Sequence, residues 1–158
     1  MSLPPEFGGQ GIPEVIAVIG KETQLAANQG FTIGASLTTG AANLIYTFGS
    51  DLQKNEFCKN MFSGKWAGTM CLTEPHAGSA VGDVITSAAR QEEGHYLIKG
   101  TKQFITNGDH EMADNIVHLL LARTPNSQQG TKGISLFIVP KKRPDGVQND
   151  IKLVSIEH

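Results

Sequence analysis

The sequence has few cysteines, little net charge and no long hydrophobic run. Cys58 and Cys71 are its only cysteines among 158 residues, and no C-x-x-C spacing joins them, so reduced, buried thiols are expected. A formal net charge of -2 gives no electrostatic basis for a nucleic-acid partner or for an anionic membrane. No apolar segment is long enough to span a bilayer, and no signal-peptide pattern follows Met1. We therefore expect a cytoplasmic, globular protein without membrane insertion.

Common catalytic and metal-binding motifs are also missing. The sequence contains no G-x-S-x-G, no H-E-x-x-H and no Walker A pattern, and the glycine-rich stretch Phe7–Gly11 follows no predicted strand. The five histidines lack ligand spacing, so no metal site is predicted. His118 lies in an apolar segment, which favours a satisfied core or interface residue. The histidines are His76, His95, His110, His118 and His158.

Residues 1–64 carry helical periodicity. Apolar residues at helical spacing predict one helix from about Ile12 to Gly30 and a second from about Ile33 to Gly49. A capping-box pattern at Ser50–Gln53 predicts the start of a third helix, which ends at Ser63–Gly64.

Residues 65–158 carry strand-like patterns separated by turn signals. Helices followed by strands indicate an α+β fold with two segregated layers. The last predicted strand reaches the end of the sequence, so we expect further chain to complete its sheet. Strands are predicted over residues 68–73, 84–91, 96–98, 102–106, 116–122, 134–139 and 151–156.

The stretch Cys71–Ser79 is the first candidate for chemistry. It is a predicted strand that opens into a tight, glycine-containing loop, whose successive N–H groups could form a nest for phosphate. Thr73 and Ser79 bracket the loop and could bond to a ring edge and to a phosphate. An ordinary β-turn with incidental hydroxyl residues fits the same residue types.

The stretch Lys102–Gly108 is the second candidate. On a strand, Phe104 and Thr106 would face the same side, so an aromatic plane and a hydroxyl could meet one flat ligand. Taken by itself, this stretch favours an aromatic side chain packed in a sheet core.

Together the two stretches resemble signatures of the acyl-CoA dehydrogenase family. TEPHAGSA resembles TEPGAGSD, and GTKQFITNG resembles GxKxWITNG. PPEFGGQG near the N-terminus resembles PxExGGxG, and the segment from Gly49 to Trp66 is similar to the helix that leads into the family's middle domain. The resemblance thus covers the whole chain. It implies that residues 1–64 are part of an N-terminal all-helical domain and residues 65–158 an incomplete middle domain, an antiparallel β-barrel or sandwich truncated at its C-terminus.

The resemblance also implies an activity. In this family a carboxylate removes the α-proton of an acyl-CoA thioester while the β-hydride passes to FAD, which leaves a trans-2-enoyl-CoA. The implied partners are an acyl-CoA substrate, an electron-transfer flavoprotein as electron acceptor, and further copies of the full-length chain in a homo-oligomer. Two alternatives stay open, namely a flavin acyl-CoA oxidase of the same fold and a non-catalytic β-domain that acts as a binding module.

Site residues carry over from the matching motif positions. Thr73 would bond the pyrimidine edge of the flavin, and Ser79 would meet the FAD pyrophosphate near the CoA arm of the substrate. Phe104 would stand against the isoalloxazine, and Thr106 would hydrogen-bond near N5. The implied FAD-binding residues are Met70, Leu72, Thr73, Gly78, Ser79, Phe104, Ile105 and Thr106, with Ser79 also implied in substrate binding.

Two positions depart from the family signatures, and the catalytic base has no counterpart. Ala80 replaces the usual Asp, and Phe104 replaces the usual Trp. We expect the catalytic carboxylate beyond His158, and neither Glu74 nor Asp83 is predicted to serve in its place. The runs HEMADNIVHLLLAR and KGISLFIVPKK resemble a subgroup of larger members that includes the 3-methylmercaptopropionyl-CoA dehydrogenases.

Overall fold

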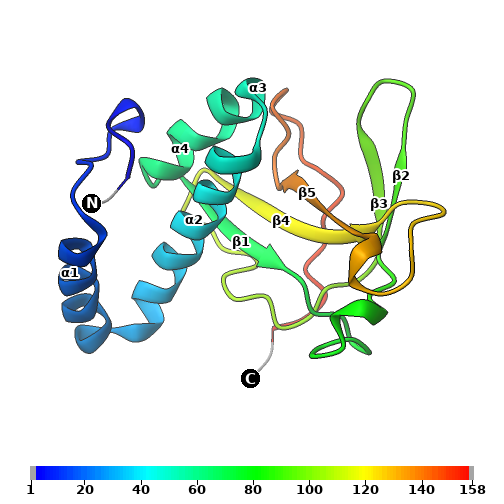
Figure 1. Cartoon of the computed structure of the whole chain (residues 1–158), viewed down its shortest axis with the longest axis horizontal. Helices are drawn as coiled ribbons and strands as arrows, with labels where there is room; N and C mark the ends of the chain where they lie inside the picture. The colour runs from blue at the N-terminus through cyan, green and yellow to red at the C-terminus, as the bar shows by residue number, and fades with distance from the viewer. Residues whose placement is uncertain (1–2, 157–158) are drawn as a thin grey trace.

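The computed structural model describes residues 3–156, and His158 lies outside them. Helices lie on one side of the molecule and a sheet on the other (Figure 1). The helical side holds a short 3-10 turn, η1 (Pro5–Phe7), followed by α1 (Glu14–Ala27) and α2 (Gln29–Phe48). A third helical stretch runs without a break through α3 (Asp51–Gln53), the π-helical turn η2 (Lys54–Cys58) and α4 (Lys59–Phe62). The three predicted helices are therefore confirmed.

The helix starts follow from local capping. The side chain of Asn28 accepts a hydrogen bond from the backbone N of Phe31 at 3.0 Å and begins α2. The predicted capping box is present, because the backbone N of Gln53 donates to Ser50 Oγ and the backbone N of Ser50 donates to Gln53 Oε1. Short-range sequence therefore sets where these helices begin.

The sheet is mixed rather than wholly antiparallel. Its central strand β4 (Asn115–Arg123) pairs in parallel with β1 (Trp66–Cys71) and antiparallel with β5 (Ile134–Pro140). β2 (Ser87–Arg90) and β3 (Tyr96–Lys99) form an antiparallel hairpin, which joins β4 through a single parallel pairing at its end. The predicted α+β class is confirmed. The parallel β1–β4 pair arises because the chain between them is long enough to return and run in the same direction.

Two predicted strands are wrong. Residues 102–106 form a loop in which Phe104 has φ 58°, a left-handed conformation that cannot continue a pleated strand. Residues 151–156 pair with no strand in the described part of the chain, although they are rich in residues that favour strands. Such residues favour an extended backbone but do not supply the neighbouring strand that pairing requires.

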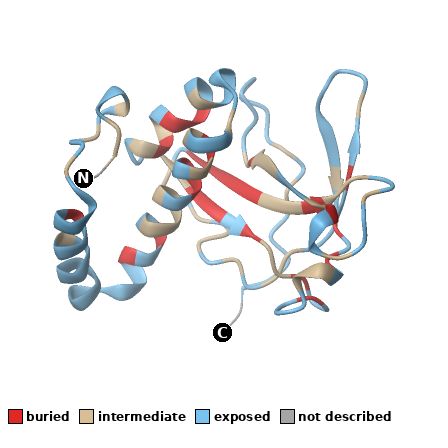
Figure 2. Cartoon of the chain, viewed as in Figure 1, coloured by how far each residue is buried: buried red, intermediate tan, exposed pale blue. Residues whose placement is uncertain are grey.

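The core lies between α2 and the sheet (Figure 2). Val117 and Leu119 on one face of β4 pack against Ala42 and Ile45 of α2 and against Met61 of α4. Because side chains alternate along a strand, His118 and Leu120 face the opposite side of the sheet. One face of β4 thus builds the core, and the other is turned toward the loops that carry the two candidate stretches.

Gly68 sets the distance between α2 and β1. A Cβ at this position would lie 2.7 Å from Met61 Cε, 2.9 Å from Ala41 Cβ and 3.2 Å from the backbone Cα of Thr38. We expect Gly68→Ala to lower the free energy of unfolding by about 1–3 kcal/mol through overpacking. Denaturant unfolding measures this loss, and Gly40→Ala is the control, because its Cβ would meet nothing within 4 Å. Equal stability of wild type and Gly68→Ala would contradict the expected close packing.

Candidate functional site

The two candidate stretches lie against each other. The backbone N of Gln103 donates to the carbonyl of Thr73 at 2.9 Å, and Lys102 Nζ donates to the carbonyl of Leu72 at 3.0 Å. These bonds join the end of β1 and its following loop to the segment 102–106. The stretches are about thirty positions apart in sequence, so their contact is a property of the tertiary fold.

The loop after β1 folds back on itself within four residues. The backbone N of Glu74 donates to the carbonyl of Ala77, and the N of Ala77 donates to the carbonyl of Glu74, both at 3.0 Å. Ala77 is buried, whereas Gly78 and Ser79 are exposed. The N–H of Ala77 is consumed inside the turn and is not available to an anion, whereas Gly78 and Ser79 lie at the exposed end of the loop.

The aromatic side chain of Phe104 is largely exposed to solvent. Its side chain sits at 67% relative exposure, and Thr106 nearby is also exposed. The predicted geometry, with both residues on one face of a strand, does not hold because no strand forms there. The left-handed backbone at Phe104 instead turns the loop and presents the ring outward.

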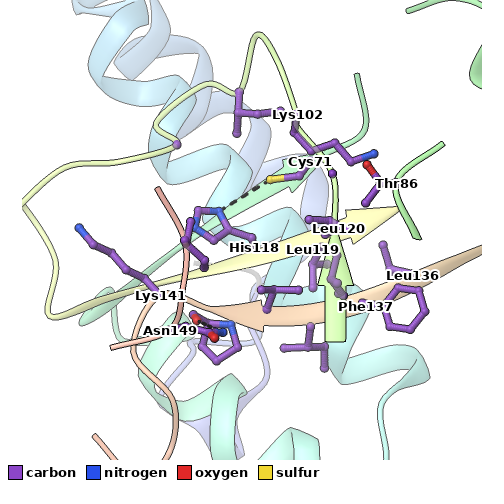
Figure 3. Close-up of a pocket in the computed structure, with 18 of the residues that line it drawn as sticks. Cys71, Thr86, Lys102, His118, Leu119, Leu120, Leu136, Phe137, Lys141 and Asn149 are labelled. Carbon is purple, nitrogen blue, oxygen red and sulfur yellow. Dashed lines mark hydrogen bonds between the residues drawn. The ribbon is translucent and has the colours of Figure 1, made fainter. Parts of the chain in front are cut away.

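The predicted site residues are distributed over two hollows and an exposed loop. A cavity of about 2020 Å³ is bounded by residues 93–109, which include β3, by strands β4 and β5, and by the segment 143–156 (Figure 3). Phe104, Ile105 and Thr106 line this cavity. Met70 lines a smaller hollow of about 200 Å³ between α2, β1 and β4. The other four line neither hollow and belong to the segment after β1; they are Leu72, Thr73, Gly78 and Ser79.

Glu74 is the most heavily bonded side chain of the region. Its side chain is 1% exposed and forms an ion pair of 2.8 Å with Lys102, whose side chain is 7% exposed. It also accepts hydrogen bonds from the backbone N of Ile85 at 2.8 Å, from the backbone N of Thr86 at 3.1 Å and from Thr86 Oγ1. Glu74 and Lys102 are parts of the two motifs, and their pairing was not predicted from the sequence. Their opposite charges were the only feature of the sequence that could have indicated the pair.

These contacts make Glu74 a poor proton acceptor. Burial acts to raise the pKa of Glu74, but the hydrogen bonds from Lys102, Thr86 and Ile85 outweigh burial and lower this pKa to about 2. A general base for a weakly acidic carbon works best with a pKa near the operating pH. Asp83, the other carboxylate considered, lies exposed in the short turn η3 (Val81–Asp83).

His118 is buried with only one ring nitrogen satisfied. Its Nδ1 lies 2.7 Å from Thr69 Oγ1 and 3.7 Å from Cys71 Sγ, whereas Nε2 is the one buried side-chain N or O atom in residues 3–156 without a hydrogen-bond partner (Figure 3). Burial lowers the pKa of His118 to about 4, helped by Lys141 and opposed by Asp109. The ring is therefore neutral near pH 7. The predicted burial of His118 is confirmed, but the prediction that both ring nitrogens find hydrogen-bond partners is not.

Other site types find no support within residues 3–156. The described residues contain no group of three His, Cys, Asp or Glu side chains arranged to hold a metal ion. Across the same stretch, no helix combines the length and apolarity that a membrane crossing requires.

Two family profiles match adjacent parts of the chain. The profile described as "Acyl-CoA dehydrogenase, N-terminal domain" matches residues 1–65, and the one described as "Acyl-CoA dehydrogenase, middle domain" matches residues 69–154.

Known proteins agree with these profiles. The 3-methylmercaptopropionyl-CoA dehydrogenase of Ruegeria pomeroyi is 42% identical over 163 aligned positions, which cover 100% of this chain and 28% of the relative. A structure of the electron transferring flavoprotein of Acidaminococcus fermentans matches with a TM-score of 0.79 and 34% identity, over 91% of this chain and 37% of that one. Glutaryl-CoA dehydrogenase from Mycobacterium smegmatis in complex with FADH2 matches with a TM-score of 0.75 and 31% identity, over 91% and 34%. The chain thus spans between a quarter and two fifths of the length of these proteins, and it belongs to the acyl-CoA dehydrogenase family.

Proposed function

We propose that this chain is the flavin-bearing part of an FAD-dependent acyl-CoA dehydrogenase, which oxidises an acyl-CoA thioester to a trans-2-enoyl-CoA. The observation that carries the proposal is the hydrogen bond from the backbone N of Gln103 to the carbonyl of Thr73, because it joins the two family motifs. Family membership and the related structure in complex with FADH2 support FAD as the cofactor.

The exposed groups fit a flavin. Phe104 offers an uncovered aromatic face at the wall of the large cavity, and a flat ring system that covers it would remove apolar surface from water. The hydroxyls of Thr73 and Thr106 would bond polar atoms of the ring, and Ser79 on the exposed loop would bond a phosphate oxygen. When bound, FAD supplies the acceptor for the hydride.

The role of this chain would be to orient the reactants rather than to remove the proton. Glu74 is the buried carboxylate of the described residues, and its pKa of about 2 makes it unsuited to abstract an α-proton. We propose that residues outside positions 1–158 provide the base. Electrons would leave to an electron-transfer flavoprotein, and the full-length protein would assemble as a homo-oligomer.

Anaerobic titration of the full-length protein with acyl-CoA thioesters tests the proposal. A dehydrogenase is expected to lose its oxidised-flavin absorbance on addition of substrate and to regain it with an electron-transfer flavoprotein. A panel that includes 3-methylmercaptopropionyl-CoA would identify the preferred acyl group. Rapid reoxidation by air would instead favour a flavin acyl-CoA oxidase, and a protein that binds no FAD would favour a non-catalytic binding module.

Phe104→Ala separates flavin binding from stability. Because the ring is 67% exposed, its loss should change the melting temperature little, while the Kd for FAD should rise roughly 3–10-fold through lost stacking. Flavin fluorescence titration measures the Kd. Phe31→Ala is the matched control, since Phe31 is 77% exposed on α2 and lines neither hollow. Unchanged FAD affinity in Phe104→Ala would contradict the assigned role.

A further inference from the structure

The ion pair between Glu74 and Lys102 links three separate segments of the chain. Lys102 Nζ donates to Glu74 Oε1 at 2.8 Å and to the carbonyl of Leu72 at 3.0 Å. The same carboxylate accepts from the backbone N of Ile85 and from Thr86, just ahead of β2. Hydrogen bonds to this one buried charge pair therefore join the end of β1, the start of β2 and the loop that follows β3.

The pair lies directly beside the residues assigned to the flavin. Glu74 follows Thr73 in the chain, and Lys102 comes two residues before Phe104. Gln103, which lies between Lys102 and Phe104, donates a hydrogen bond from its backbone N to the carbonyl of Thr73. The paired residues Glu74 and Lys102 therefore lie within one or two positions of Thr73 and Phe104, the residues proposed to contact the flavin.

Phe104 needs such anchoring. A non-glycine residue at φ 58° is held against its own backbone preference, and such conformations persist where the surrounding structure over-determines them. The bonds of Lys102 and Gln103 hold the chain immediately before Phe104 in place. Without them, this loop would be free to relax toward a right-handed or extended backbone and carry the ring away.

We propose that the Glu74–Lys102 pair is a positioning element of the flavin site, which sets where Phe104 and Thr106 stand relative to Thr73. The inference rests on the proposed function. Neither side chain touches the substrate or serves as the base. The pair acts through the backbone segments that it joins.

Two variants probe this role at different strengths. Lys102→Met keeps the aliphatic stem and removes the ammonium group, so both of its hydrogen bonds are lost. Thr86→Val keeps the side-chain shape and removes only the hydroxyl that donates to Glu74, so we expect it to keep the ion pair and the fold. Matched controls are Lys21→Met and Thr23→Val, the same two changes at exposed positions on α1.

The measurements are made on the full-length protein with FAD. For Lys102→Met we expect the Kd for FAD to rise and kcat to fall by roughly tenfold or more, with a smaller change in KM, because a misplaced flavin affects the transferred hydride more than substrate capture. The absorption and circular dichroism spectra of the bound flavin should change as well. Thr86→Val should shift all of these quantities in the same direction by a smaller factor, and the two controls should leave them unchanged.

Distinct outcomes would overturn the inference. If Thr86→Val and Lys102→Met lose only thermal stability, while FAD affinity, flavin spectra and kcat stay at wild-type values, the pair is purely structural. If Lys102→Met does not fold, Thr86→Val decides the question alone. FAD binding and reduction of the bound flavin by substrate would then still stand for the wild type, so that failure is separate from failure of the proposed function. A wild type that binds no FAD would overturn both.

Discussion

Lys102→Met is expected to lower the free energy of unfolding by about 3–5 kcal/mol. The Glu74 carboxylate is 1% exposed, and removal of its cationic partner would leave it charged inside the protein. The carbonyl of Leu72 would also lose its bond from Lys102 Nζ. Urea unfolding of wild type and variant, followed by far-UV circular dichroism, measures the difference.

A second substitution shows where this loss comes from. Glu74→Gln combined with Lys102→Met removes both charges and keeps one amide oxygen to accept from Thr86. The double variant should therefore regain a large part of the stability lost in Lys102→Met. If the double variant is no more stable than the single one, the loss does not come from an uncompensated buried charge, and a packing defect at Lys102 would explain it better.

Acidification below pH 6.5 is expected to destabilise the fold through His118. Its pKa is about 4 in the folded chain and near 6.5 when unfolded, so the unfolded chain binds more protons between these values. The contribution of His118 is fully present above pH 6.5 and is lost as the pH falls toward 4. The shift corresponds to about 3 kcal/mol. Chemical denaturation at a series of pH values measures this loss.

His118→Gln should flatten this pH dependence, because glutamine does not titrate. His95→Gln is the matched control, because it makes the same change at an exposed position. Glu74 acts in a separate window. With a folded pKa of about 2, its contribution is present above about pH 4.5 and is lost as the pH falls toward 2. A pH slope between 4 and 6.5 that survives in His118→Gln would refute the assignment to this residue.

The helical half of the fold was predictable because its signals are local. The capping box at Ser50–Gln53 and the apolar stripes of α1 and α2 act over three to eight residues, and the structure keeps them. Most strands were also found from short β-rich runs between turns. The motif letters after β1 and β3 pointed to the family, which the family profiles and the Ruegeria relative bear out.

Segment 102–106 shows where local reasoning failed. The segment was predicted as a strand, yet Phe104 adopts a left-handed backbone because bonds from Lys102 and Gln103 to the end of β1 fix the loop. The energy of those distant contacts exceeds the preference of one residue for an extended conformation. No window of sequence contains both partners.

The sequence by itself determined the helices, most of the strands and the family. The tertiary structure alone decided that β1 and β4 run parallel, that Glu74 is paired and therefore strongly acidic, and that Nε2 of the buried His118 is unpaired. Each of these features depends on groups 28 to 49 residues apart in the chain. Burial and pairing are set by what surrounds a group in space, and that is fixed only once the helices and strands have packed together.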